Sequence, residues 1–125
     1  MDLNRDDPPS GPIVTGFSGR GFRIRDTVFP GGLLLTPELA LPWEDCPAVE
    51  GLTPAALGTL CDLGPAPEFM LLGTGSGLVQ PPRAFVRAME AKGVGVDVMD
   101  SRAAARAWGV LRAEQRWIVA ALMPL

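Results

Sequence analysis

Apolar and polar residues alternate at two different periods along this chain, and the change from one period to the other predicts the order of its elements. In residues 13–36, runs such as Phe22-Arg23-Ile24-Arg25 alternate apolar and charged side chains with a period of two, which is typical of half-buried strands. Turn residues separate these runs: Ser18-Gly19, Asp26-Thr27 and Pro30-Gly31-Gly32. The pattern therefore predicts an antiparallel meander.

Helical spacing first appears after residues 37–52, which carry three prolines and Trp43 and predict a long irregular connection. We predict a first helix over residues 53–64, because Thr53 can cap it, Pro54 suits its first turn and three side chains share one face: Leu57, Leu60 and Cys61. A glycine followed by a proline ends this helix.

The second half of the chain predicts three strands and two more helices. The runs 68–72 and 117–122 are apolar almost throughout, as in strands buried on both faces, and the first of them is expected at the centre of the sheet. Alternating valines in residues 94–98 predict the strand between them. Helices are expected over residues 82–93 and 101–111, the second of them capped by Asp100 or Ser101.

Strands separated by helices of about ten residues imply a parallel or mixed sheet. We therefore predict an α/β fold: a central mixed sheet with flanking helices, plus an N-terminal antiparallel hairpin or meander. Residues 1–12 are acidic and proline-rich and predict a flexible leader, and residues 13–125 are expected to form a single α/β domain. The apolar last strand could lie at a sheet edge and pair with a second copy, so a homodimer stays open.

The composition excludes several kinds of chemistry. The chain contains no histidine, which removes Ser-His-Asp and Cys-His nucleophilic catalysis, proton transfer by imidazole near neutral pH and histidine-ligated metals. Its two cysteines cannot form a four-cysteine metal site, and we expect Cys46 and Cys61 to be reduced thiols that pack as small apolar side chains. No metal and no cofactor is expected, and no catalytic residue is assigned.

Charge and hydropathy limit the partners. The net charge is −3, and no cluster of basic residues provides the positive face that nucleic acids require. The arginines at positions 20, 23 and 25 are interpreted as the solvent face of a strand. No apolar run approaches the length of about 20 residues that spans a membrane, and the N-terminus lacks the pattern of a signal peptide. We expect a soluble, cytoplasmic protein that is not an integral membrane protein.

A glycine-rich run follows the predicted central strand: Gly73-Thr74-Gly75-Ser76-Gly77. In open α/β sheets, ligands bind beyond the carboxyl ends of the strands, and glycines let backbone N–H groups approach an anion. A nucleotide-binding loop would lead directly into a helix, whereas residues 78–82, which include two prolines, intervene here. The run is therefore either a plain loop or a small-anion site.

A second candidate group lies at the start of the last predicted helix. Asp97 occupies an otherwise apolar strand, and if it were buried it would need a partner such as Arg106. The alternatives are a structural Asp–Arg pair beside an N-cap, or a cleft in which the glycine loop faces this helix. The candidate ligand-binding residues are Gly73, Thr74, Gly75, Ser76, Asp100 and Arg106.

Several segments of this chain resemble a known family. They are Leu71-Leu72-Gly73-Thr74-Gly75, the run from Gly93 to Asp100, Ala103-Ala104 with Arg106, and the last strand, and together they extend over about residues 13–124. The family is that of the mitochondrial complex I assembly factor 3 domain, which many small bacterial and archaeal proteins of unknown function share; the chain also resembles the animal adipogenesis-associated domain protein. The resemblance implies a single α/β domain, no established enzymatic activity and, for the mitochondrial relative, a role in assembling a respiratory complex through protein partners.

The last helix departs from the family pattern. Members often have Thr-Gly-Ala-Ala-Cys-Arg-Thr-Tyr-Asn in this position, where residues 101–109 of this chain read Ser-Arg-Ala-Ala-Ala-Arg-Ala-Trp-Gly. The cysteine, second threonine, tyrosine and asparagine of the pattern thus correspond to Ala105, Ala107, Trp108 and Gly109. Arg106 matches the arginine of the pattern. A catalytic role based on the cysteine or the tyrosine therefore does not apply to this chain.

Two functions of different classes follow from these observations. The first is a non-enzymatic protein-binding or assembly module whose partner could be a subunit of a membrane complex. The alternative is a small-molecule or anion-binding protein, or a weak enzyme, that uses a cleft between residues 73–77 and 100–106. An exposed apolar patch would favour the first function, and a pocket formed by the candidate residues would favour the second.

Overall fold

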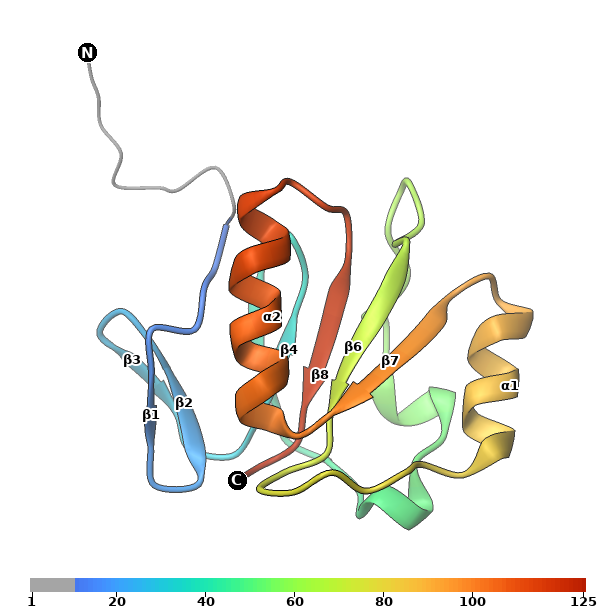
Figure 1. Ribbon diagram of the computed structural model, residues 1–125, viewed down its shortest axis with the longest axis horizontal. Coiled ribbons are helices and arrows are strands. Elements are labelled where there is room, and N and C mark those ends of the chain that lie inside the picture. Colours follow the sequence, from blue (N-terminus) through green and yellow to red (C-terminus); the bar gives the residue numbers. More distant parts are fainter. Residues whose placement is uncertain (1–10) are drawn as a thin grey trace.

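The computed structural model describes residues 11–125, so most of the predicted leader lies outside the described residues. Two sheets contain the strands of this part of the chain (Figure 1). The strands β1 (Gly16–Ser18), β2 (Gly21–Ile24) and β3 (Thr27–Phe29) form an antiparallel sheet in that order. The antiparallel meander predicted near the N-terminus is therefore confirmed for these three strands.

The fourth strand belongs to the main sheet and does not pair with the small one. β4 (Gly32–Leu35) pairs antiparallel with both β5 (Ala40–Trp43) and β8 (Val119–Leu122). β6 (Phe69–Gly73) runs parallel to β8 on one side and to β7 (Gly95–Met99) on the other, which gives the order β5-β4-β8-β6-β7. The predicted α/β fold with a central mixed sheet is correct. β6 is an interior strand between β8 and β7, while the middle position belongs to β8.

The position of β8 corrects one prediction. Both of its edges are already hydrogen-bonded, to β4 and to β6, so it has no free edge for a second copy of the chain. The edge prediction was wrong, and the apolar character of β8 instead reflects burial on both faces of a central strand.

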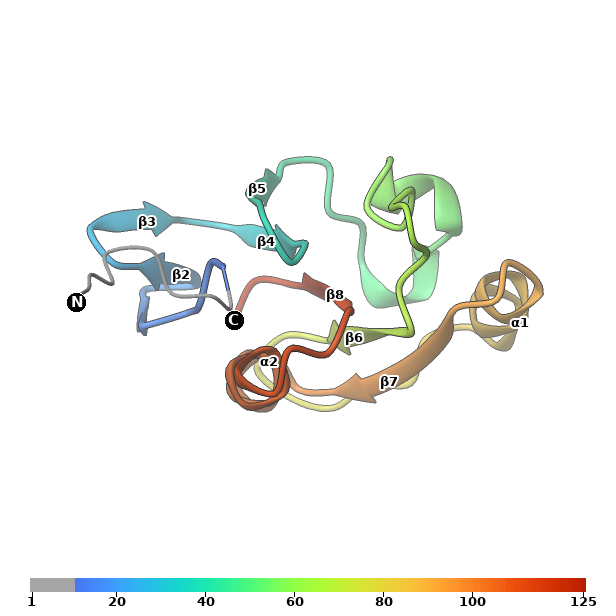
Figure 2. The same cartoon turned by 90° about the horizontal axis from the view of Figure 1, so that it is seen from above.

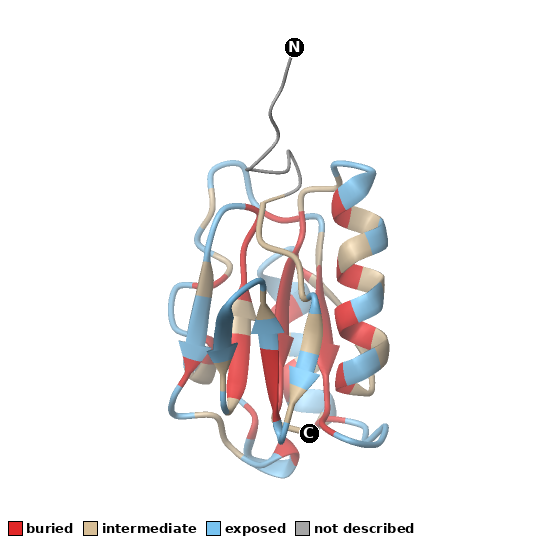
Figure 3. Ribbon diagram, turned by 90° about the vertical axis from the view of Figure 1, so that its left-hand side faces the viewer, coloured by how far each residue is buried: buried red, intermediate tan, exposed pale blue. Residues whose placement is uncertain are grey.

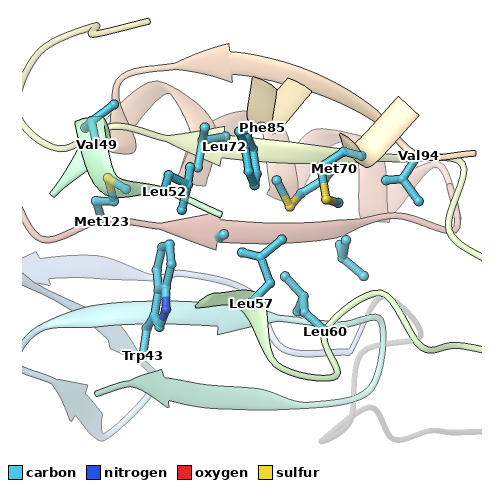
Figure 4. Packing of buried hydrophobic residues seen from close by; sticks show 13 residues of the cluster. Trp43, Val49, Leu52, Leu57, Leu60, Met70, Leu72, Phe85, Val94 and Met123 are labelled. Carbon is cyan, nitrogen blue, oxygen red and sulfur yellow. The ribbon is translucent and has the colours of Figure 1, made fainter. Parts of the chain in front are cut away.

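Each face of the main sheet packs against its own apolar cluster. Successive side chains of β6 alternate between them: Met70 and Leu72 belong to one cluster, and Leu71 to the other. The first cluster lies under α1 (Arg83–Ala91) and the segment 49–63. Figure 4 shows side chains of this cluster packed together beside the strands. The second lies under α2 (Ser101–Ala113) and the three-stranded sheet, which flank the other face (Figure 2).

The two predicted C-terminal helices are confirmed. On α1, Phe85 and Met89 lie one turn apart and both are buried against the sheet. Asp100 is the N-cap of α2, and its Oδ1 accepts a hydrogen bond of 2.8 Å from the backbone N–H of Ala103. Trp108 on α2 is fully buried, and its indole N–H donates to the carbonyl of Pro12 at 2.8 Å, which fixes the start of the described chain.

The helix predicted over residues 53–64 does not form as an α-helix. Only Pro54–Leu57 form a short 3-10 turn, and the Thr53 side chain makes no capping hydrogen bond. Gly58 ends the turn with φ of 59° and ψ of −127°, a conformation outside the helical region. Leu57 and Leu60 are nevertheless buried in the first cluster, so their spacing reflects packing of an irregular segment onto the sheet.

The connection predicted over residues 37–52 is also more regular than expected. It contains β5 and a 3-10 turn at Val49–Gly51. Trp43 ends β5 and is buried, and its indole N–H donates to the carbonyl of Ala56 at 2.9 Å. This side chain therefore anchors the irregular segment to the sheet, and it is a core residue.

Phe22 packs the three-stranded sheet onto the main domain, and we predict that Phe22→Ala lowers the free energy of unfolding by about 3–5 kcal/mol. Its side chain is fully buried in the second cluster, so truncation leaves a cavity there. Urea denaturation followed by circular dichroism should show a single transition at lower urea. The matched control, Val28→Ala on β3, alters a residue that is 40% exposed and should change stability by less than about 0.5 kcal/mol. Equal stability of the two variants would contradict this packing.

Candidate functional site

The glycine run lies beside the N-terminus of α2. Because β6 and β7 are parallel neighbours, the loops that follow them leave the sheet at the same edge. The Thr74 N–H donates to the carbonyl of Met99 at 3.0 Å, and the Ser101 N–H donates to the carbonyl of Gly75 at 2.8 Å. The structure thus brings residues 73–77 next to Asp100.

A fully buried hydroxyl holds this arrangement together. The Ser101 Oγ accepts a hydrogen bond of 2.8 Å from the Gly75 N–H and donates one of 2.7 Å to the carbonyl of Met123. Gly73 permits the approach, since a Cβ at this position would lie 2.7 Å from both the Cα and the Oγ of Ser101. Gly75 has φ of +100°, which favours glycine. Helix packing and backbone conformation therefore account for both glycines without a ligand.

The side chain of Thr74 closes the rest of the loop. Its Oγ1 donates to the carbonyl of Gly77 at 2.7 Å and accepts from the N–H of Val79 at 3.0 Å. Thr74 itself is buried. The Thr74 hydroxyl and the N–H groups of Thr74, Gly75 and Val79 are thus hydrogen-bonded within the chain. Its exposed part consists of Ser76 and the residues after it, among which Leu78 is 59% and Val79 is 42% exposed.

The charged candidates lie apart from one another. Asp100 serves as the N-cap of α2, as described above. Asp97 is exposed on β7, so it needs no buried partner, and no ion pair joins it to Arg106 within residues 11–125. Arg106 is exposed and borders a groove beside β1. The structure therefore places Arg106 on the side of α2 that faces the small sheet.

Both thiols are partly buried against the first apolar cluster and are free of disulfides. Burial raises the pKa of Cys46 to about 11. Burial, and then the nearby carboxylate of Asp62, raise the pKa of Cys61. Both groups are therefore protonated at neutral pH and are poor nucleophiles. Within residues 11–125, no group of three or more cysteine, aspartate or glutamate side chains gathers as metal ligands would.

The sequence prediction missed two residues that shape this region. The sequence predicts only an N-cap role for Ser101, although a serine that follows an aspartate cap is free to turn its hydroxyl inward. The pattern assigns Leu78 to a connection, although an exposed apolar residue between a glycine run and two prolines can indicate a contact surface.

The described residues form a single α/β domain. In the loop after β6, the N–H groups of Thr74 and Gly75 are both hydrogen-bonded within the chain. The chain belongs to the family described as protein of unknown function (DUF498/DUF598), whose model matches residues 14–123. This confirms the family resemblance seen in the sequence.

Relatives of two kinds match nearly the whole chain. An uncharacterised protein of Rhodobacter capsulatus is 34% identical over 112 residues, which cover 90% of this chain and 84% of that protein. NADH dehydrogenase (ubiquinone) 1 alpha subcomplex assembly factor 3 is 24% identical in Danio rerio, covering 99% of this chain and 71% of that protein. The same factor from Drosophila melanogaster is 26% identical, and the match covers only 59% of its length.

Solved structures have the same fold. A crystal structure from Bordetella parapertussis has a TM-score of 0.80 at 31% identity and covers 94% of this chain and 100% of that one. A solution structure from Bordetella pertussis, described as a Mth938-like domain, has a TM-score of 0.80 at 27% identity and covers 99% of this chain and 92% of that one. Within residues 11–125, neither helix has the length and apolar character needed to cross a membrane.

We predict that Ser101→Ala destabilises the protein by about 1–3 kcal/mol for each buried group that loses its partner, namely the N–H of Gly75 and the carbonyl of Met123. The free energy of unfolding from urea titration measures this loss. The matched control is Ser76→Ala in the same loop, where the side chain is exposed, and it should cost less than about 0.5 kcal/mol. A Ser101→Ala variant no less stable than Ser76→Ala would show that the hydroxyl does not hold the loop.

Proposed function

We propose that this chain is a non-enzymatic protein-binding module that takes part in assembling a membrane-bound respiratory complex. The observation that carries the proposal is the orientation of the loop after β6. A loop built to hold an anion or a small ligand presents free backbone donors, whereas here those of Thr74 and Gly75 are bonded internally. Leu78 and Val79 are the large side chains it offers to a partner.

The rigidity of this loop favours binding of a protein surface. Single exposed apolar residues are ordinary, but two adjacent ones on a segment fixed by Thr74 and Ser101 lose little conformational entropy on binding. Apolar side chains held in this way are suited to pockets on a partner. The exposed apolar side chains therefore support the protein-binding function over the ligand-binding one.

The relatives support the second part of the proposal. Those with a named role are assembly factors of NADH dehydrogenase, and their similarity extends over 99% of this chain in Danio rerio and in Bos taurus. We therefore propose that the partner is a subunit of that complex. The free thiols of Cys46 and Cys61 agree with a cytoplasmic location.

The alternative, a small-molecule or anion site formed by Gly73, Thr74, Gly75, Ser76, Asp100 and Arg106, has less support. Two of the backbone donors are occupied within the chain, and Asp100 caps α2. Arg106 borders a different groove. Ser76 is exposed and would remain the group most accessible to such a ligand.

We predict that Leu78→Asp reduces capture of NADH dehydrogenase subunits by at least about tenfold, since it places a charge on the proposed contact. The tagged chain is used as bait in a detergent extract of Rhodobacter capsulatus membranes, and captured subunits are quantified by mass spectrometry. The control is Val110→Asp on α2, a residue that is 61% exposed, and it should capture normally.

Two results would count against this function. One is recovery of these subunits by the wild-type chain no better than by the tag alone, and the other is equal capture by the Leu78→Asp chain. Native mass spectrometry tests the alternative in parallel: a small anion retained by the wild type and lost on Ser76→Ala would favour the ligand-binding function.

A further inference from the structure

A groove of about 200 Å³ lies between β1 and the middle of α2. Its lining consists of Val14, Thr15, Gly16, Phe17, Ala105 and Arg106. Within the described chain, β1 is an edge strand that pairs with β2 alone, and Figures 1 and 3 show it beside α2. The groove thus combines an apolar floor with a strand that has one open edge.

One arginine lines this groove, and two others lie beside residues that line it. Arg106 forms part of its wall. The guanidinium carbon of Arg102, one turn earlier on α2, lies 5.5 Å from the ring centroid of Phe17. On the outer face of the small sheet, the Cδ of Arg23 on β2 lies 3.9 Å from the position of a Cβ on Gly16. All three arginines are exposed.

Among residues 11–125, no carboxylate forms an ion pair with these arginines. The residues that line the groove include no aspartate or glutamate, and residues 13–25 contain three arginines and no acidic residue. The nearest acidic residue along α2, Asp100, already accepts the N-cap hydrogen bond. A chain of net charge −3 therefore keeps a local positive site here.

We propose that this groove docks an acidic, extended segment of a protein partner. Carboxylates of the segment would pair with Arg102 and Arg106, which can bind them in bidentate geometry. An apolar side chain between the carboxylates would lie on the floor formed by Val14, Phe17 and Ala105. The open edge of β1 offers backbone groups to a chain in extended conformation.

A peptide fits this groove better than the other anionic macromolecules. A nucleic acid would need a line of phosphate contacts, and the chain as a whole is acidic. A membrane surface would need a broader basic face, whereas these charges border one groove with an apolar floor. The inference rests on the proposed protein-binding function and adds the chemistry of a second contact, separate from Leu78.

The test measures binding of a fluorescein-labelled synthetic peptide of alternating glutamate and valine to the full chain by fluorescence anisotropy. Arg106→Glu should weaken binding by at least about tenfold, because one favourable charge pair becomes a repulsive one. The matched control, Arg87→Glu, makes the same charge change at an exposed position of α1 and should stay within about twofold of the wild type. A lysine–valine peptide should bind at least about tenfold more weakly than the glutamate–valine peptide. Circular dichroism confirms that each variant is folded.

Each contrary result overturns the proposal in an identifiable way. An equal loss for Arg87→Glu would show a general charge effect, and absence of peptide binding by the wild type would remove the proposed partner chemistry. Binding to phosphatidylglycerol vesicles with the same dependence on Arg106 would assign the groove to lipid. Binding that appears only after Asp6→Asn and Asp7→Asn would assign it to the chain's own N-terminal residues.

The two proposals can fail separately. Leu78→Asp should leave peptide binding within about twofold of the wild type, because Leu78 does not line the groove. Loss of subunit capture on Leu78→Asp together with failure of the peptide test would retain the protein-binding function and reject only this groove. If Arg106→Glu weakens peptide binding but the wild type captures no subunit, the groove is a peptide-binding site and the proposed partner is wrong.

Discussion

The hydroxyl group of Ser101 is the contact on which the arrangement of the candidate site depends. It is fully buried and bonds to the loop after β6 through Gly75 and to the end of β8 through Met123. Three segments far apart in sequence therefore meet at one oxygen atom, and the missing side chain of Gly73 lets them approach. A buried hydroxyl that both donates and accepts tolerates little displacement, so it fixes where α2 begins relative to the sheet.

Both proposed contacts follow from that fixed start. The loop is held against α2 through the N–H groups of Gly75 and Val79, and Leu78 is its most exposed large apolar side chain. Residues four apart lie on the same face of an α-helix, so Arg102 and Arg106 both lie beside β1. A glycine run at the carboxyl end of a strand is thus not a ligand site by itself. Whether it becomes one depends on where its N–H groups are directed.

Much of the fold could be predicted because a regular repeat of apolar residues over many positions indicates which side chains are buried. The strand β6 and the helices α1 and α2 were found from such repeats. The error at residues 53–64 has a physical cause: Leu57 and Leu60 are spaced like helical residues because they pack on the sheet, while the conformation of Gly58 interrupts the turn. The edge position predicted for β8 was wrong because one strand's pattern shows that it is buried but not which strands border it.

The candidate site was harder to predict because it depends on pairings that no local pattern encodes. The neighbouring carboxyl ends of β6 and β7 could be anticipated from a parallel sheet, and with them the closeness of residues 73–77 and Asp100. The inward turn of Ser101 could not, since it requires the end of β8 to lie within reach. Charge shows the same limit. The total of −3 argues against an anionic partner, yet folding places Arg102 and Arg106 together at one groove, and a partner that docks there is exposed to this local positive charge.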